Sequence, residues 1–113
     1  MNVLATGSFD FSRIPENRDL VFVASTIGYG WKTLADFLSI DEGTVEKIEE
    51  DYGYNTETQI VQLLKAWKKK HGARSTFREL LKSMRECKAV SVDWFMLQKE
   101  LGFSSGKNNN CVL

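Results

Sequence analysis

The chain has 113 residues, of which 42% are hydrophobic and 27% charged, and its formal net charge is zero. This balance is typical of one globular domain with one core, and it argues against a generally basic protein that binds nucleic acid or anionic membrane. The longest strongly apolar run, residues 20–24, is far too short to insert across a bilayer. Two cysteines do not make a disulfide framework, so we expect both to be reduced and the protein to be cytoplasmic.

The two ends of the chain lack the apolar spacing of the middle. Residues 1–16 carry glycine, serine and proline without a helical period, and we expect a flexible lead-in with one apolar anchor such as Phe11 or Ile14. Residues 104–113 are rich in serine and asparagine and are expected to form a disordered tail. The folded domain is therefore predicted to cover residues 17–103.

Apolar residues recur at helical spacing in six segments, joined by short connections that favour antiparallel neighbours. The first segment, residues 19–27, ends before Gly28, although its β-branched residues also suit a strand. The second segment begins at Trp31. The third follows Asp41, whose side chain makes a good N-cap.

The fourth and fifth segments have the clearest start signals. The fourth begins with Thr56 and Gln59, read as a capping box, and continues to Gly72. The fifth begins with a second capping box, Thr76 with Glu79.

The sixth segment follows Ser91 and stops at Gly102. Its expected apolar face consists of Val92, Phe95, Met96 and Leu101. Trp94 belongs either to the core or to an exposed contact surface. In the second to fifth segments the helical period assigns ten residues to the core: Trp31, Leu34, Ala35, Leu38, Ile48, Ile60, Leu64, Trp67, Leu80 and Met84.

Four stretches in combination resemble the signature of the death domain family. Residues 28–38 resemble the G-x-x-W-x-x-L-A-x-x-L opening of the family's second helix, and residues 45–49 resemble the I-x-x-I-E of its third. Residues 59–67 resemble the fourth helix, whose characteristic tryptophan is Trp67, and residues 76–84 resemble the fifth. The pattern is most similar to adaptor death domains, such as those of the Fas-associated and caspase-2 adaptors.

The resemblance implies an all-α fold, a six-helix antiparallel bundle of the death-domain type. It also implies a non-enzymatic module that assembles with other death-domain proteins, copies of itself included, in apoptotic or innate-immune signalling. One departure is Gly30, where the family often has Asp. A chain of this length leaves no room for a second effector domain, so we expect either one domain of a longer protein or a stand-alone modulator.

No residue pattern predicts catalysis, a small-molecule substrate, a cofactor or a metal site. The single histidine, His71, follows a run of lysines at a helix end, where it suits the helix dipole. Cys87 is expected to be a partly buried small apolar residue. A nucleophilic pair of these two residues lacks any motif around it.

The charged residues are concentrated in two opposite groups. The acidic patch is predicted to be Asp41, Glu42, Glu46, Glu49, Glu50 and Asp51, which with Lys47 give residues 41–51 a net charge of −5. The basic patch is predicted to be Lys65, Lys68, Lys69, Lys70, Arg74 and Arg78, which give residues 65–78 a net charge of +6. The resemblance implies that such patches attract each other between subunits. The other interpretation is that both are merely solvated faces.

Two further functions remain as alternatives. Residues 34–49 also resemble a DNA-binding helix-turn-helix, but the helix that would enter the groove is acidic and would be repelled by phosphate. The alternative function is a helical nucleic-acid- or lipid-binding domain that uses the basic residues 65–78.

Overall fold

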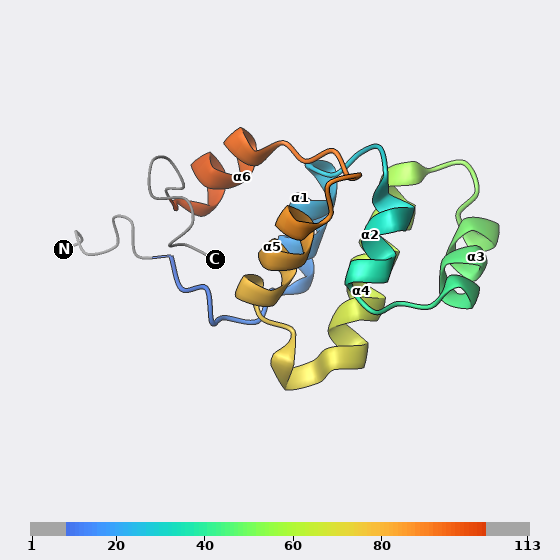
Figure 1. Ribbon diagram of the computed structural model, residues 1–113, viewed down its shortest axis with the longest axis horizontal. Helices are drawn as coiled ribbons and strands as arrows, with labels where there is room; N and C mark the ends of the chain where they lie inside the picture. Colours follow the sequence, from blue (N-terminus) through green and yellow to red (C-terminus); the bar gives the residue numbers. More distant parts are fainter. Residues whose placement is uncertain (1–8, 104–113) are drawn as a thin grey trace.

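The computed structural model describes residues 9–103, so the first half of the expected lead-in and the expected tail lie outside the described residues. Within this part the chain forms a bundle of α-helices (Figure 1): α1 Asn17–Ser25, α2 Trp31–Phe37, α3 Glu42–Asp51, α4 Thr56–His71, the short 3-10 helix η2 Gly72–Arg74, α5 Phe77–Glu86 and α6 Trp94–Leu101. The predicted all-α, six-helix fold is confirmed. Segment 19–27, for which a strand was the alternative, is helical as far as Ser25.

Helix α4 is the longest helix, and both α1 and α3 pack against it, while α2 packs against α5. Figure 1 shows α3 at one end of the long axis and α6 at the other. The ten residues that the helical period assigns to the core are all buried. They pack with further buried residues of α1, α3, α4, α5 and α6, including Leu20, Val45, Leu63, Phe77 and Leu97.

Side-chain caps fix where several helices begin. Asp41 accepts a hydrogen bond from the backbone N–H of Thr44 at 3.0 Å, as an N-cap should. The predicted capping box at Thr56 is wrong by one residue, because Asn55 is the N-cap of α4 and accepts from the N–H of Thr58 at 2.9 Å. The side chain of Gln59 is buried instead and donates to a backbone carbonyl of the preceding loop.

Aromatic rings attach the N-terminal segment to the bundle. The ring of Phe9 lies 5.0 Å from that of Phe77, and the ring of Phe11 lies 5.3 Å from that of Phe103, both in edge-to-face geometry. Ile14, the other suggested anchor, is exposed. The expectation of a flexible lead-in is therefore wrong for residues 9–16, which pack against the core.

Two backbone hydrogen bonds hold the same segment. The N–H groups of Phe77 and Arg78 donate to the carbonyls of Arg13 and Phe11, at 2.9 and 2.8 Å. Both donors belong to the first turn of α5, where no carbonyl of the helix itself can accept them. The N-terminal segment thus supplies hydrogen-bond acceptors to N–H groups at the start of a helix that lies more than sixty positions later in the sequence.

Helix α6 begins later than the sequence suggested. Val92 is held in an extended bridge to the residue after α1's C-cap, and Asp93 is the N-cap of α6. The helix therefore buries Leu97 and turns Phe95 and Met96 outward. The prediction that Phe95 and Met96 form the apolar core face is wrong. The pairing of Val92 with a distant segment delays the first turn of the helix, and the spacing of apolar residues along the sequence does not reveal such pairing.

Candidate functional site

The acidic patch lies on α3 and its N-cap. Five of its six residues are exposed, and Glu49 is half-buried beside Lys32, with which it forms an ion pair. Hydrogen bonds from Thr44 lower the pKa of Asp41 below its ordinary value. Asp51 pairs with Lys47 one turn earlier, at 3.6 Å. Half of the patch is thus partly neutralised by its own neighbours or engaged as a cap.

The carboxylates of the acidic patch are divided between two sides of α3. A groove of about 420 Å³ between α2 and α3 is lined by acidic residues around an apolar floor: Lys32, Thr33, Asp36, Ile40, Glu42, Val45, Glu46 and Glu49. Asp51 lies on the other side, in a groove of about 340 Å³ between α3 and α4. The surface with the greatest excess of negative charge is therefore the α2–α3 groove.

The basic patch is not one surface. Lys65 and Lys69 line the groove between α3 and α4, on the same side as Asp51. The ammonium of Lys70 donates to the backbone carbonyl of Ser39. The structure therefore divides the basic residues of α4 between a surface groove and a structural hydrogen bond.

Two members of the basic patch lie beyond α4. Arg74 lines a third cleft, of about 680 Å³, whose other walls come from the C-terminal ends of α2 and α4 and from α5. The guanidinium of Arg78 lies over the ring of Phe11, 5.8 Å from its centre. Neither position adds to a continuous basic face with Lys65 and Lys69.

Several charges have no ion-pair partner within residues 9–103. In the two patches they include Glu42, Glu46 and Glu50 on the acidic side and Lys65, Lys68, Lys69 and Arg74 on the basic side. Glu42 and Glu46 line the α2–α3 groove, whereas Lys65 and Lys69 line the α3–α4 groove, so these charges do not cancel within the chain. These are the side chains that a charged partner would meet.

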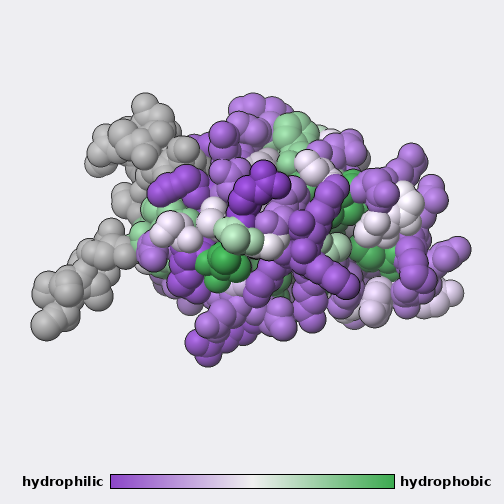
Figure 2. All heavy atoms as spheres, turned by 90° about the horizontal axis from the view of Figure 1, so that it is seen from below, coloured by the Kyte–Doolittle hydropathy of each residue, from purple (hydrophilic) through white to green (hydrophobic). Residues whose placement is uncertain are grey.

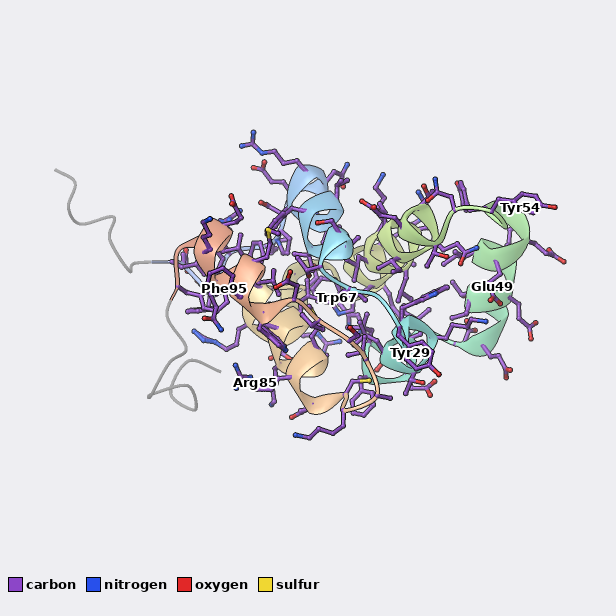
Figure 3. The ribbon with its side chains drawn as sticks, turned by 90° about the horizontal axis from the view of Figure 1, so that it is seen from above. Tyr29, Glu49, Tyr54, Trp67, Arg85 and Phe95 are labelled. Carbon is purple, nitrogen blue, oxygen red and sulfur yellow. The ribbon has the colours of Figure 1, made fainter. Side chains whose placement is uncertain are left out.

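Exposed aromatic residues form a feature that the helical period did not predict. Tyr54 is fully exposed, Tyr29 is 87% exposed and Phe95 is 75% exposed. Figure 3 shows Tyr54 beside α3 at one end of the molecule and Phe95 on α6 at the other. In the space-filling view from below, most of the surface is hydrophilic, and apolar residues appear in separate small areas (Figure 2).

Tyr29 stands on the loop between α1 and α2, which packs closely against the backbone of Ala89. Gly30 has φ +86°, and a β-carbon there would lie 2.1 Å from the backbone oxygen of Ala89. Only glycine fits this close approach. A shallow pocket of about 550 Å³ lies next to it, lined by residues 28–32 and by Thr56 of α4. The departure of Gly30 from the Asp common in the family thus has a packing cause.

Neither residue considered for nucleophilic chemistry is arranged for it. The Nε2 atom of His71 lies 3.1 Å from the backbone oxygen of Leu38, which fixes the ring at the end of α4. Cys87 is buried in the core cluster. Among residues 9–103 no group of histidine, cysteine and acidic side chains could hold a metal ion. In the same part of the chain no helix is long and apolar enough to cross a bilayer.

Comparison with known proteins finds a match over the part of the chain that contains the four signature stretches. The model of the family described as "Death domain" matches residues 19–92. The FAS-associated death domain protein of Bos taurus is 31% identical over 77 residues, which are 65% of this chain and 37% of that protein. The Mus musculus protein of the same name is 28% identical over 91 residues, covering 80% of this chain and 44% of the relative.

A receptor is also similar. Tumor necrosis factor receptor superfamily member 6 of Mus musculus is 36% identical over 76 residues, 64% of this chain and 23% of the receptor. The chain thus matches less than half the length of each of these relatives.

Proposed function

The chain belongs to the death domain family, and from that premise we propose that it assembles with other death domains by electrostatic attraction between its α2–α3 groove and the basic residues of a partner's α4. Membership makes it a non-enzymatic protein-interaction module of death signalling. The identity of the surfaces, of the partners and of the assembly is our proposal.

The observation that carries the proposal is the segregation of unpaired charge. Glu42 and Glu46 line one groove and have no cation within ion-pair distance among residues 9–103. Lys68 and Lys69 on α4 have no acidic group within ion-pair distance in the same part of the chain. Complementary potentials of this kind accelerate encounter and suppress wrong partners more than they add affinity.

Such a contact is head-to-tail. One copy presents its acidic groove and the next presents α4, so each bound copy leaves one surface of each kind open. Growth then continues until the rotation closes a ring or the supply of partners ends. We propose that this geometry allows both homotypic and heterotypic assembly.

The partners we propose are receptor or adaptor death domains. One relative is named for association with FAS, and another is a member of the tumor necrosis factor receptor superfamily. By analogy this chain would act in the cytoplasm, where such modules meet, in apoptotic or innate-immune signalling. We also propose that the binding unit is the predicted domain of residues 17–103 extended by residues 9–16.

Charge reversal with rescue tests the contact. Glu42→Lys combined with Glu46→Lys should weaken association by about tenfold or more, mainly through a slower association rate, and so should Lys68→Glu with Lys69→Glu. An equimolar mixture of the two double variants should recover association, because each supplies the sign that the other lacks. Sedimentation velocity at several salt concentrations measures self-association, and interferometry against an immobilised receptor death domain measures the heterotypic contact.

The matched control is a double reversal elsewhere. Glu86→Lys with Glu100→Lys changes the net charge equally, but these exposed residues lie on the last turn of α5 and on α6, outside the α2–α3 groove and α4. It should associate like the wild type. If the groove variant behaves like this control, or if mixing gives no recovery, the proposed surfaces are wrong.

The nucleic-acid or lipid alternative gains no support from the arrangement of the cations. Lys70 and Arg78 are engaged with a backbone carbonyl and an aromatic ring, and Arg74 lies in a separate cleft. Salt-dependent binding of duplex RNA or of phosphatidylserine vesicles that is lost in the Lys68 and Lys69 double reversal would favour it instead.

A further inference from the structure

The guanidinium of Arg85 is incompletely satisfied. It lies on the last turn of α5 over the ring of Trp94, 5.3 Å from the ring centre. Its Nε atom is buried and has no hydrogen-bond partner, the one such side-chain atom in the part of the chain that the structure describes. No carboxylate of that part lies within ion-pair distance of it. The Nε atom is covered, so a carboxylate from another molecule would pair with the terminal nitrogens of this guanidinium.

Two apolar side chains that follow Trp94 on α6 are exposed. Phe95 is 75% exposed and Met96 is 41% exposed, both in the first turn of α6 directly after Trp94. We call Arg85, Trp94, Phe95 and Met96 the α6 surface. Aromatic residues, methionine and arginine are the types enriched in the buried centres of protein interfaces.

The opposite end of the molecule carries the complementary chemistry. Tyr54 is fully exposed and Tyr52 is partly exposed in the connection between α3 and α4. Glu50, at the end of α3, is exposed and has no ion pair among residues 9–103. We call Glu50, Tyr52 and Tyr54 the α3–α4 corner. Figure 3 shows Phe95 and Tyr54 toward opposite ends of the long axis.

We propose that the α6 surface of one copy binds the α3–α4 corner of a second copy. The carboxylate of Glu50 would pair with the guanidinium of Arg85, and the two tyrosines would pack against Phe95 and Met96. A cation with exposed aromatic and aliphatic groups thus meets an anion with exposed aromatic groups.

The contact is heterologous, and its two surfaces lie at opposite ends, so it extends along the long axis and does not close at two copies. It uses neither the α2–α3 groove nor Lys68 and Lys69. A single chain could therefore take part in both contacts at once, one along its length and one across it.

A charge exchange tests this contact alone. Arg85→Glu and Glu50→Lys should each reduce self-association of the full chain by about tenfold in sedimentation velocity. An equimolar mixture of the two variants should recover it, because the introduced carboxylate of one faces the introduced ammonium of the other. Mixing Arg85→Glu with the Glu42 and Glu46 double reversal should give no such recovery, which separates this contact from the one proposed above.

Two controls guard against misfolding and general charge effects. Lys82→Glu makes the same charge change one turn earlier on α5 and should leave association unchanged. Phe95→Ser should weaken association without lowering the melting temperature, since the side chain is already exposed. A wild-type chain that stays monomeric up to millimolar concentration would overturn the proposal. So would variants that associate like Lys82→Glu, or a mixture without recovery.

Discussion

Arg13 and Phe77 contact each other through both backbone and side chain. The carbonyl of Arg13 accepts the N–H of Phe77 at 2.9 Å, and its guanidinium lies 4.7 Å from the centre of the Phe77 ring. Arg13 also pairs with Asp19 of α1 at 3.0 Å. Arg13, which precedes α1, thereby connects the first helix to the start of the fifth.

We expect Arg13→Ala to lower the free energy of unfolding by about 1 kcal/mol, because it removes a cation–π contact and a partly shielded ion pair. Arg18→Ala is the control, since Arg18 is highly exposed and its contact with Glu16 is long. It should change stability by less than about 0.5 kcal/mol. Urea denaturation measures both, and equal effects would show that the N-terminal segment contributes nothing specific.

Trp67→Ala should destabilise the domain by about 3–5 kcal/mol, because Trp67 is 3% exposed and lies in the core cluster. That loss approaches the whole stability of a small domain, so the variant should be largely unfolded at 37 °C. Tyr54→Ala removes an aromatic ring of similar size from a fully exposed position and should leave the melting curve unchanged. Circular dichroism compares the two, and a wild-type melting curve for Trp67→Ala would contradict its place in the core.

Two glycines give opposite expectations for the same substitution. Gly30→Ala should cost more than about 2 kcal/mol, because φ is +86° and the new methyl would meet the backbone oxygen of Ala89. Gly43→Ala should stabilise by about 0.5 kcal/mol, since Gly43 is helical and no atom lies within 4 Å of a β-carbon there. Thermal unfolding of both variants is the measurement. A tolerated alanine at position 30 would mean that the loop between α1 and α2 can shift away from Ala89.

Acid should weaken the start of α3. The pKa of Asp41 is lowered in the folded state by its hydrogen bonds from Thr44, so the stability it contributes is present above the unfolded value near 3.8 and is lost as pH falls through the lower folded value. Asp41→Asn keeps a good cap without a titrating group. The melting temperature of this variant should therefore fall less between pH 5 and pH 2 than that of the wild type. Parallel curves would show that the cap does not depend on the charge.

Much of the architecture followed from the sequence because it rests on local rules. The helical period identified buried positions such as Leu34, Leu64 and Leu80, since a residue's place on a helix face depends only on its spacing. Asp41 and Thr76 were recognisable as N-caps, because a cap bonds to an N–H only three residues away. The combination of stretches also indicated the family, which the match over residues 19–92 confirms.

Contacts between distant segments decided the rest. Residues 9–16 have no period of their own, and they are ordered by N–H groups and rings that α5 presents. Extended pairing of Val92 with Ile27 delays α6 and turns Phe95 outward, a shift that the spacing within residues 91–102 does not record. The sequence alone determined which charges the chain carries. The packing of α3 and α4 decided which of them share a groove, because neighbours on a surface are set by how helices cross and not by their order along the chain.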